Sequence, residues 1–344
     1  MRPAYVAATG SFLPPREQLA DAVARGRIPE GVTAEMLAAS GITAVCAAPD
    51  PTESAPEMAI AALSRAFASA GISTGAVSRH FHASSFDGAQ MRVWSPAAYV
   101  QAAFGPTRAP AMGVNATCGG GMAAFEVAAI ITQACGETVA VTTADLWPAP
   151  PVNRWHTMPA FGLGDGAGAT VLTVEATNAI ARVASCKTIT DSSLEAGART
   201  PLPFTPGDPK VIDFRERKDT FLETMPREEF DARRDAGLLA AVEQAMREAD
   251  RTASQIDFVI PSFLGRRMTD REYTQPLSRQ GFSGVQLETV CEMGLSIGHA
   301  GSSDPFIALD LLRSERHLTK GTTVLVLGVG GGYTWTAAVL DIIN

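Results

Sequence analysis

Charged residues make up only 19% of this 344-residue chain, aromatic residues only 7%, and the formal net charge is -8. Basic residues form no stripe along the chain, which excludes general nucleic-acid binding. We expect no apolar run long enough for a membrane span, and residues 1–6 are typical of a first strand rather than a signal peptide. We therefore expect a cytoplasmic protein with no membrane partner.

Cysteine is scarce and scattered, with five residues in all. An odd number at wide, irregular spacing gives neither a disulfide framework nor a set of metal ligands. We therefore expect reduced thiols and no metal. The five positions are Cys46, Cys118, Cys135, Cys186 and Cys291.

Apolar runs alternate with helical stretches, and this order is typical of a layered α/β fold. The predicted strands cover residues 138–143, 167–174, 256–260, 323–327 and 334–342. The predicted helices cover residues 57–70, 122–134, 237–250 and 305–314. Pro, Arg and acidic residues gather over 192–231, which we interpret as a loop-rich insertion.

Cys118 lies in a turn, Asn115-Ala116-Thr117-Cys118-Gly119-Gly120-Gly121, that leads into a helix rich in small residues. Backbone N–H groups and the dipole at a helix N-terminus favour the thiolate, which is the nucleophilic form of cysteine. Glycines after the thiol let a substrate approach closely. The turn therefore indicates a nucleophile, and the alternative is a buried structural cysteine.

His299 lies in a second small-residue turn before a helix, Gly298-His299-Ala300-Gly301, and Asp304 follows it. Asp304-Pro305 is also typical of an N-cap and first helical residue. Both roles are compatible, because a carboxylate has two oxygens. A cysteine, a histidine and an acid supply a nucleophile, its base and the group that orients the base. The two turns are similar, as expected if two pseudo-symmetric halves of the chain face one site.

A third glycine-rich segment, residues 328–335, joins two predicted strands. Backbone N–H groups in such a loop suit an oxyanion hole when paired with the N–H of Cys118. The segment lacks the following helix that a dinucleotide-binding loop needs. Residues 161–169 are also glycine-rich, and there we expect a structural turn into a strand.

Together these motifs resemble β-ketoacyl carrier-protein synthase III and its thiolase-fold relatives. Four motifs in order carry the resemblance: Thr117-Cys118-Gly119, Gly164-Asp165-Gly166-Ala167-Gly168-Ala169, the Gly298 segment, and Gly330-Gly331-Gly332-Tyr333-Thr334-Trp335. The resemblance implies a five-layered αβαβα fold of two pseudo-symmetric halves, residues 1–175 and 176–344. It also implies a homodimer, a pantetheine tunnel, acylation of Cys118, and Gly331 as the second oxyanion N–H.

Two departures from the family set the expected chemistry. Ser262 stands where the condensing enzymes have a catalytic histidine, and His299 stands where they have an asparagine. Those two donors stabilise the enolate formed in decarboxylative condensation, so their replacement weakens that reaction. The set of Cys118, His299 and Asp304 instead resembles the acyltransferase branch of natural-product and antibiotic pathways.

We therefore expect an acyltransferase that works without a cofactor. The acyl group would pass from a coenzyme A or carrier-protein thioester, through Cys118, to a hydroxyl, an amine or another carrier. A condensing starter-unit ketosynthase and a catalytically idle carrier-binding relative are the alternatives. Either Ser262 or the basic clusters could contact substrate or carrier, and solvated charged loops are the alternative for the clusters. The clusters are Arg215, Arg217 and Lys218, and Arg266 and Arg267.

Overall fold

The computed structural model describes residues 2–28, 32–48, 54–86, 93–105, 107–147, 152–158, 161–199 and 212–344. The proline-rich segment 201–209, interpreted above as part of the insertion, lies outside the described residues. The same is true of residues 148–151, which follow Trp147.

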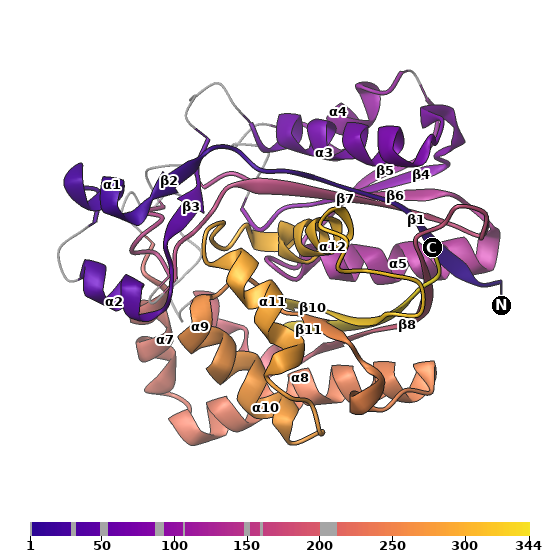
Figure 1. Cartoon of the computed structure of the whole chain (residues 1–344). Coiled ribbons are helices and arrows are strands. Elements are labelled where there is room, and N and C mark those ends of the chain that lie inside the picture. The colour runs from indigo at the N-terminus through magenta and orange to yellow at the C-terminus, as the bar shows by residue number, and fades with distance from the viewer. Residues whose placement is uncertain are drawn as a thin grey trace.

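Nine strands form one hydrogen-bonded sheet in the order β5-β4-β6-β7-β1-β8-β11-β10-β9. Among the described residues, the two parts of this sheet pair only where three residues of β1 face three of β8. The two parts stack one above the other (Figure 1). The strands are β1 (Ala4–Phe12), β4 (Arg79–Ala83), β5 (Ala111–Val114), β6 (Val139–Asp145), β7 (Gly166–Thr173), β8 (Ala181–Thr190), β9 (Phe258–Ile260), β10 (Thr323–Gly330) and β11 (Thr334–Ile342).

Helices fill the space between the two parts and cover both outer faces, which gives five layers (Figure 1). Helices α3 (Ala55–Ala70) and α4 (Pro96–Ala102) lie outside the first part, and α8 (Arg227–Ala249) lies outside the second. Helices α5 (Gly120–Cys135) and α12 (Asp304–Ser314) lie between them. The predicted αβαβα fold is confirmed.

The strand pattern repeats. In the first half β4 runs parallel to β6, β6 antiparallel to β7, and β7 antiparallel to β1. In the second half β9 runs parallel to β10, β10 antiparallel to β11, and β11 antiparallel to β8. Each central helix precedes the corresponding strand, α5 before β6 and α12 before β10. The boundary at residue 175 falls between β7 and β8, and we keep it as a proposal.

Strands β2 (Arg16–Gln18) and β3 (Ala44–Cys46) form a separate two-stranded sheet. The short helices are α1 (Leu19–Ala24), α2 (Ala34–Ala39), α6 (Ala196–Arg199), α7 (Phe214–Leu222), α9 (Gly265–Thr269), α10 (Gln275–Ser278) and α11 (Val285–Gly294). A π-helical turn, Asp270–Thr274, joins α9 to α10.

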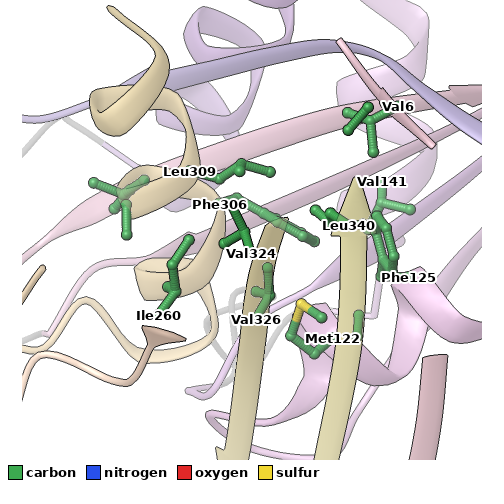
Figure 2. Close-up of a cluster of buried hydrophobic side chains, with 14 of the residues drawn as sticks. Val6, Met122, Phe125, Val141, Ile260, Phe306, Leu309, Val324, Val326 and Leu340 are labelled. Carbon is green, nitrogen blue, oxygen red and sulfur yellow. The ribbon is translucent and has the colours of Figure 1, made fainter. Parts of the chain in front are cut away.

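The main core lies between the two parts of the sheet, around α5 and α12 (Figure 2). Phe125 of α5 packs on Phe306 of α12, with ring centroids 6.2 Å apart. Residues Thr117–Cys135 are long and apolar enough to cross a membrane, contrary to our expectation that no such run exists. Helix α5 is apolar because it is sandwiched between two sheets, as expected of a central helix.

Another hydrophobic cluster, here called the cap cluster, packs β3, α1 and α2 against the loops that precede β7. Its buried members are Leu19, Ala22, Leu37, Ile42, Val45, Trp147, Val152, Trp155, Phe161 and Leu163. It anchors the loops that surround His299.

The predicted loop-rich insertion at 192–231 is wrong in its described parts. It contains α6, α7 and the first turn of α8, which begins at Arg227, ahead of the predicted start at residue 237. The Asp213 side chain caps α7 by accepting from the N–H groups of Arg215 and Glu216. Charged residues on the solvent side of these helices produced the composition that we interpreted as a loop.

Candidate active site

Cys118 lies in the turn immediately before α5, and Gly119 is the N-cap of that helix. The turn is closed by two backbone bonds, from Gly119 N to Ala116 O at 3.1 Å and from Gly120 N to Thr117 O at 2.9 Å. The thiol is half-buried, and no acceptor for the N–H of Cys118 is found within the described part of the chain. A half-exposed thiol at a helix start with a free amide beside it fits a nucleophile.

The structure brings Cys118, His299 and Asp304 together. His299 Nε2 lies 3.2 Å from Cys118 Sγ, and His299 Nδ1 lies 2.5 Å from Asp304 Oδ2. The imidazole joins two turns that are 181 positions apart in the sequence. This is the arrangement of a nucleophile, a base and an orienting acid.

Asp304 is the first residue of α12, and Ser303 is its N-cap. The expectation that Asp304 caps the helix is therefore wrong. Its carboxylate reaches back instead: Oδ1 accepts from Ala300 N at 2.7 Å, and Oδ2 accepts from Phe263 N at 2.8 Å. Two backbone amides and the imidazole hold the fully buried carboxylate in place.

The pKa of His299 lies well above its usual value. Burial alone lowers this pKa, but the charges of Asp304 and of the Cys118 thiolate, with the hydrogen bonds to both, raise it by more. The surroundings of His299 therefore favour its protonated imidazole.

The backbone of His299 is fixed by the loop before β7. His299 N donates to Gly162 O at 2.8 Å, and Gly164 N donates to His299 O at 3.0 Å. A Cβ at Gly164 would lie 2.2 Å from Ile297 O, so this close approach needs glycine. Residues 161–169 were expected to be a structural turn, and they also position the histidine.

Two aromatic rings of the cap cluster face the imidazole of His299. The Phe161 ring is edge-on at 5.5 Å between centroids, and the Trp147 ring lies at 6.5 Å. The Trp147 indole N–H donates to Gly164 O, which fixes that ring. An apolar wall on the imidazole limits access of water to the base.

Asp145, at the end of β6, holds the turn that follows His299. One carboxylate oxygen accepts from both the N–H and the hydroxyl of Ser302, at 2.8 and 3.0 Å. The other oxygen accepts from Ser85 N at 2.6 Å and Ser84 Oγ at 2.9 Å. Burial raises the pKa of Asp145, and these hydrogen bonds oppose the shift. Asp145 was not predicted from the sequence. The feature that could have indicated it is an acidic residue directly after an apolar run.

The glycine-rich turn between β10 and β11 lies against the nucleophile turn. A Cβ at Gly330 would lie 2.2 Å from Ala116 O. Gly331 N donates to Thr117 Oγ1 at 2.6 Å. The predicted oxyanion donor Gly331 therefore has an acceptor inside the protein, and the sequence analysis overlooked Thr117.

Ser262 is buried just after β9, next to the amide of Phe263 that binds Asp304. Its hydroxyl accepts from the Tyr273 hydroxyl at 3.0 Å. Burial raises the pKa of Tyr273, so the phenol keeps its proton. Ser262 thus lies behind the acid of the triad, and no bond to Cys118 or His299 is found in the described residues.

The basic clusters make no hydrogen bond or ion pair with the triad within the described residues. Arg266 is paired with Glu292 at 2.7 Å, and Arg217 donates to Ala198 O at 3.3 Å. Lys218 lies over the Phe230 ring at 4.8 Å, and its burial lowers its pKa. Arg215 and Arg267 are exposed, and their guanidinium groups have no ion-pair or hydrogen-bond partner within the described residues. A role in carrier binding remains a prediction for these side chains.

Two further histidines lie in surroundings typical of structural residues. His156 Nε2 lies 3.4 Å from Asp213 Oδ2, and His317 is exposed beyond the end of α12. All five cysteines are free thiols. Within the described ranges, no group of three or more His, Cys, Asp or Glu residues could hold a metal ion.

Comparisons with known proteins find relatives named β-ketoacyl synthase III. The family model "3-Oxoacyl-[acyl-carrier-protein (ACP)] synthase III C terminal" matches residues 246–342. The β-ketoacyl-[acyl-carrier-protein] synthase III of Neisseria meningitidis serogroup B is 26% identical over 357 residues, covering 99% of this chain and 100% of the relative. The enzyme of the same name from Nitratidesulfovibrio vulgaris is 27% identical over 71% of this chain and 70% of its own length.

Solved structures show the same fold. The acyltransferase ChlB3 superposes with a TM-score of 0.90 at 27% identity, covering 99% of this chain and 98% of its own. The synthase III FabH of Pseudomonas aeruginosa PAO1 gives 0.77 at 18% identity, covering 100% and 99%. This chain is thus similar to the synthase III proteins and has their thiolase fold.

Proposed function

We propose that this protein is an acyltransferase of natural-product biosynthesis, which moves an acyl group from a coenzyme A or carrier-protein thioester to a hydroxyl, an amine or another carrier. The observation that carries the proposal is the chain of contacts from Cys118 Sγ through His299 to Asp304. The likeness to the acyltransferase ChlB3 over almost the whole chain supports it.

The first half-reaction loads Cys118. Its thiolate attacks the thioester carbonyl carbon, and the carbonyl oxygen takes up negative charge. The bond from that carbon to the pantetheine sulfur then breaks, and the departing sulfur takes the Nε2 proton of His299. The thiol ester formed on Cys118 is neutral. His299 has lost both its proton and the thiolate that raised its pKa.

The second half-reaction uses the neutral imidazole as a base. Nε2 takes a proton from the acceptor hydroxyl or amine as its oxygen or nitrogen attacks the acyl carbon. The bond to Cys118 breaks, and the sulfur leaves as a thiolate. Asp304 keeps the other ring nitrogen protonated, at 2.5 Å, so the same tautomer serves each turnover.

Condensation is the alternative, and the relatives named synthase III favour it. It requires donors to an enolate oxygen. His299 is committed to Cys118 and Asp304, and Ser262 faces Tyr273 behind the acid. Because both side chains already have hydrogen-bond partners, these contacts support acyl transfer without loss of carbon dioxide. A catalytically idle carrier-binding role is the remaining alternative.

Loading and chasing the enzyme tests the proposal. The protein is incubated with a panel of acyl-coenzyme A and acyl-carrier thioesters, and the adduct is read by intact-protein mass spectrometry with Cys118→Ala as control. The loaded enzyme is then offered alcohols, amines or malonyl carrier protein. We expect release by an alcohol, an amine or a second carrier without loss of carbon dioxide. A β-ketoacyl product would establish the condensing enzyme, and no adduct with any donor would establish the idle protein.

We further propose that the protein is a cytoplasmic homodimer without a resident cofactor. Strand β5 is an edge strand of the sheet. Around it lie exposed apolar side chains, with exposed fractions of 40% for Met112, 42% for Val127 and 53% for Ile130. An edge strand flanked by apolar side chains is suited to pairing with a second copy.

A further inference from the structure

Thr117, the residue before the nucleophile, has an unusual backbone conformation. Its φ is +49°, in the left-handed region that favours glycine. A β-branched side chain is disfavoured there more than most. Gly119 is the N-cap of α5, so Thr117 is not needed to cap the helix. Strain of this kind persists only where the surrounding structure holds it, and it gathers at functional sites.

The conformation places the Thr117 hydroxyl at the amide of Gly331. Gly331 N donates to Thr117 Oγ1 at 2.6 Å, across two turns that are 214 positions apart in the sequence. The Thr117 N–H donates to Asn115 Oδ1 at 3.3 Å. The two turns approach so closely that residue 330 must be glycine, because a Cβ at Gly330 would lie 2.7 Å from Thr117 Oγ1 and 2.9 Å from Gly119 N.

The hydroxyl has one hydrogen left to donate. A threonine hydroxyl can accept two hydrogen bonds and donate one. Thr117 Oγ1 accepts from Gly331, and its own hydrogen has no acceptor within the described ranges of the chain. The side chain is half-buried and adjoins the nucleophile. Meanwhile, the position that an oxyanion would take at the Gly331 amide is filled by this hydroxyl.

We propose that the Thr117 hydroxyl is an oxyanion donor, with Gly331 acting through it as a positioning residue. The proposal rests on the proposed function, since it requires that Cys118 takes an acyl group. As the thiolate attacks, the carbonyl oxygen becomes negative and receives hydrogen bonds from the Thr117 hydroxyl and the Cys118 N–H. No proton is transferred in this step. A hydroxyl that already accepts an N–H bond is a stronger donor, because hydrogen bonds in a chain polarise one another.

Three substitutions separate this role from the competing one, in which Thr117 only blocks Gly331. Thr117→Ser keeps the hydroxyl, Thr117→Val keeps the shape without it, and Thr117→Ala uncovers the Gly331 amide. We would measure single-turnover acylation by an acyl-coenzyme A that loads the wild type. The control reaction is alkylation of Cys118 by iodoacetamide, which uses the same thiolate but forms no oxyanion.

We expect Thr117→Val and Thr117→Ala to acylate about 100-fold more slowly, the typical loss for one oxyanion donor. Thr117→Ser should stay within a few-fold of the wild type. Alkylation rates should be unchanged in all three variants, which a merely structural defect would not allow.

Three results would overturn the proposal. Acylation of Thr117→Ala as fast as the wild type would show that Gly331 donates directly. Equal losses in acylation and alkylation would assign Thr117 to folding of the turn. A wild type that is alkylated but takes no acyl group from any donor would overturn the proposed function, and the role of Thr117 with it.

Discussion

His299 has a partner on each ring nitrogen, and the two partners differ in when they carry charge. Asp304 is buried beside Nδ1, whereas in the proposed mechanism Cys118 carries charge only when no acyl group is attached to it. Loading of Cys118 therefore changes the charge next to Nε2 and converts the ring from an acid to a base. The contact between His299 Nε2 and Cys118 Sγ would thus activate the thiol and also determine at which step the imidazole gives or takes a proton.

This coupling predicts the pH dependence of thiol reactivity. The raised pKa of His299 means that its proton, and with it the ion pair, is retained as pH rises from acid values and is lost only above that raised pKa. Alkylation of Cys118 by iodoacetamide should therefore change little between pH 6 and pH 8. In His299→Ala, alkylation should rise with pH as for an ordinary thiol, about tenfold per unit below about 8.5.

The alkylation profile of His317→Ala supplies the control, because that histidine is exposed and outside the site. Its curve should overlay the wild type. Parallel curves for wild type and His299→Ala would contradict an ion pair at Cys118.

Single residues could be predicted from the sequence where a short local motif is typical of the chemistry. Cys118 is followed by three glycines at the start of a helix, His299 lies between Gly298 and Gly301 ahead of another helix, and Asp304 comes five residues after His299. Thr117, Asp145 and the Trp147 ring were missed because their roles depend on partners far along the chain. The Asp145 carboxylate, for example, binds Ser302, 157 positions away.

At the scale of elements, apolar runs predicted the strands that are buried on both faces. Every residue of β6 and β7 is buried, so these strands consist of continuous apolar or small residues. Strand β8 (Ala181–Thr190) was missed because buried and half-buried residues alternate along much of it. The helices of the 192–231 region were missed because their exposed faces are charged.

The edge strand β5 yields a prediction about assembly. Ile130 on α5 is 53% exposed near that edge, and a charge there would be buried without a partner in a dimer. Ile130→Arg should weaken self-association by about 100-fold or more, as measured by analytical ultracentrifugation over a range of concentrations.

Val285→Arg provides a matched control, since Val285 is 75% exposed on α11, away from β5. It should leave the sedimentation profile unchanged. A monomeric wild type, or an Ile130→Arg variant that associates as tightly as wild type, would place the dimer contact elsewhere or exclude it.

For the molecule as a whole, two buried histidines on β4 link stability to pH. Burial lowers the pKa of His80 to about 4, and burial with the neighbouring His80 lowers that of His82 to about 3. Both rings share the Thr142 hydroxyl, at 2.8 and 2.9 Å. The native state thus keeps both imidazole rings neutral in a pH range where the unfolded chain binds protons.

The sign follows from that difference in proton binding. Below about pH 6.5 the unfolded chain binds protons that the native state does not bind, so the free energy of unfolding falls as pH falls. Between pH 6.5 and pH 5 the loss should be roughly 2 kcal/mol per histidine. Urea unfolding at pH 7 and pH 5 measures it, and His82→Gln should reduce the slope. A slope unchanged by that substitution would assign the effect to other groups.

The position of β1 has a consequence for how the chain is made. A ribosome releases Ala4–Phe12 long before both neighbours of this strand, β7 and β8, which begin only at Gly166 and Ala181. Until they emerge, β1 is an unpaired apolar strand of the kind that invites aggregation. The helix α3, which packs on β1 in the finished protein, is made much earlier and can shield one face of it meanwhile. Translation speed between α3 and β7 is thus a variable on which the yield of soluble protein depends.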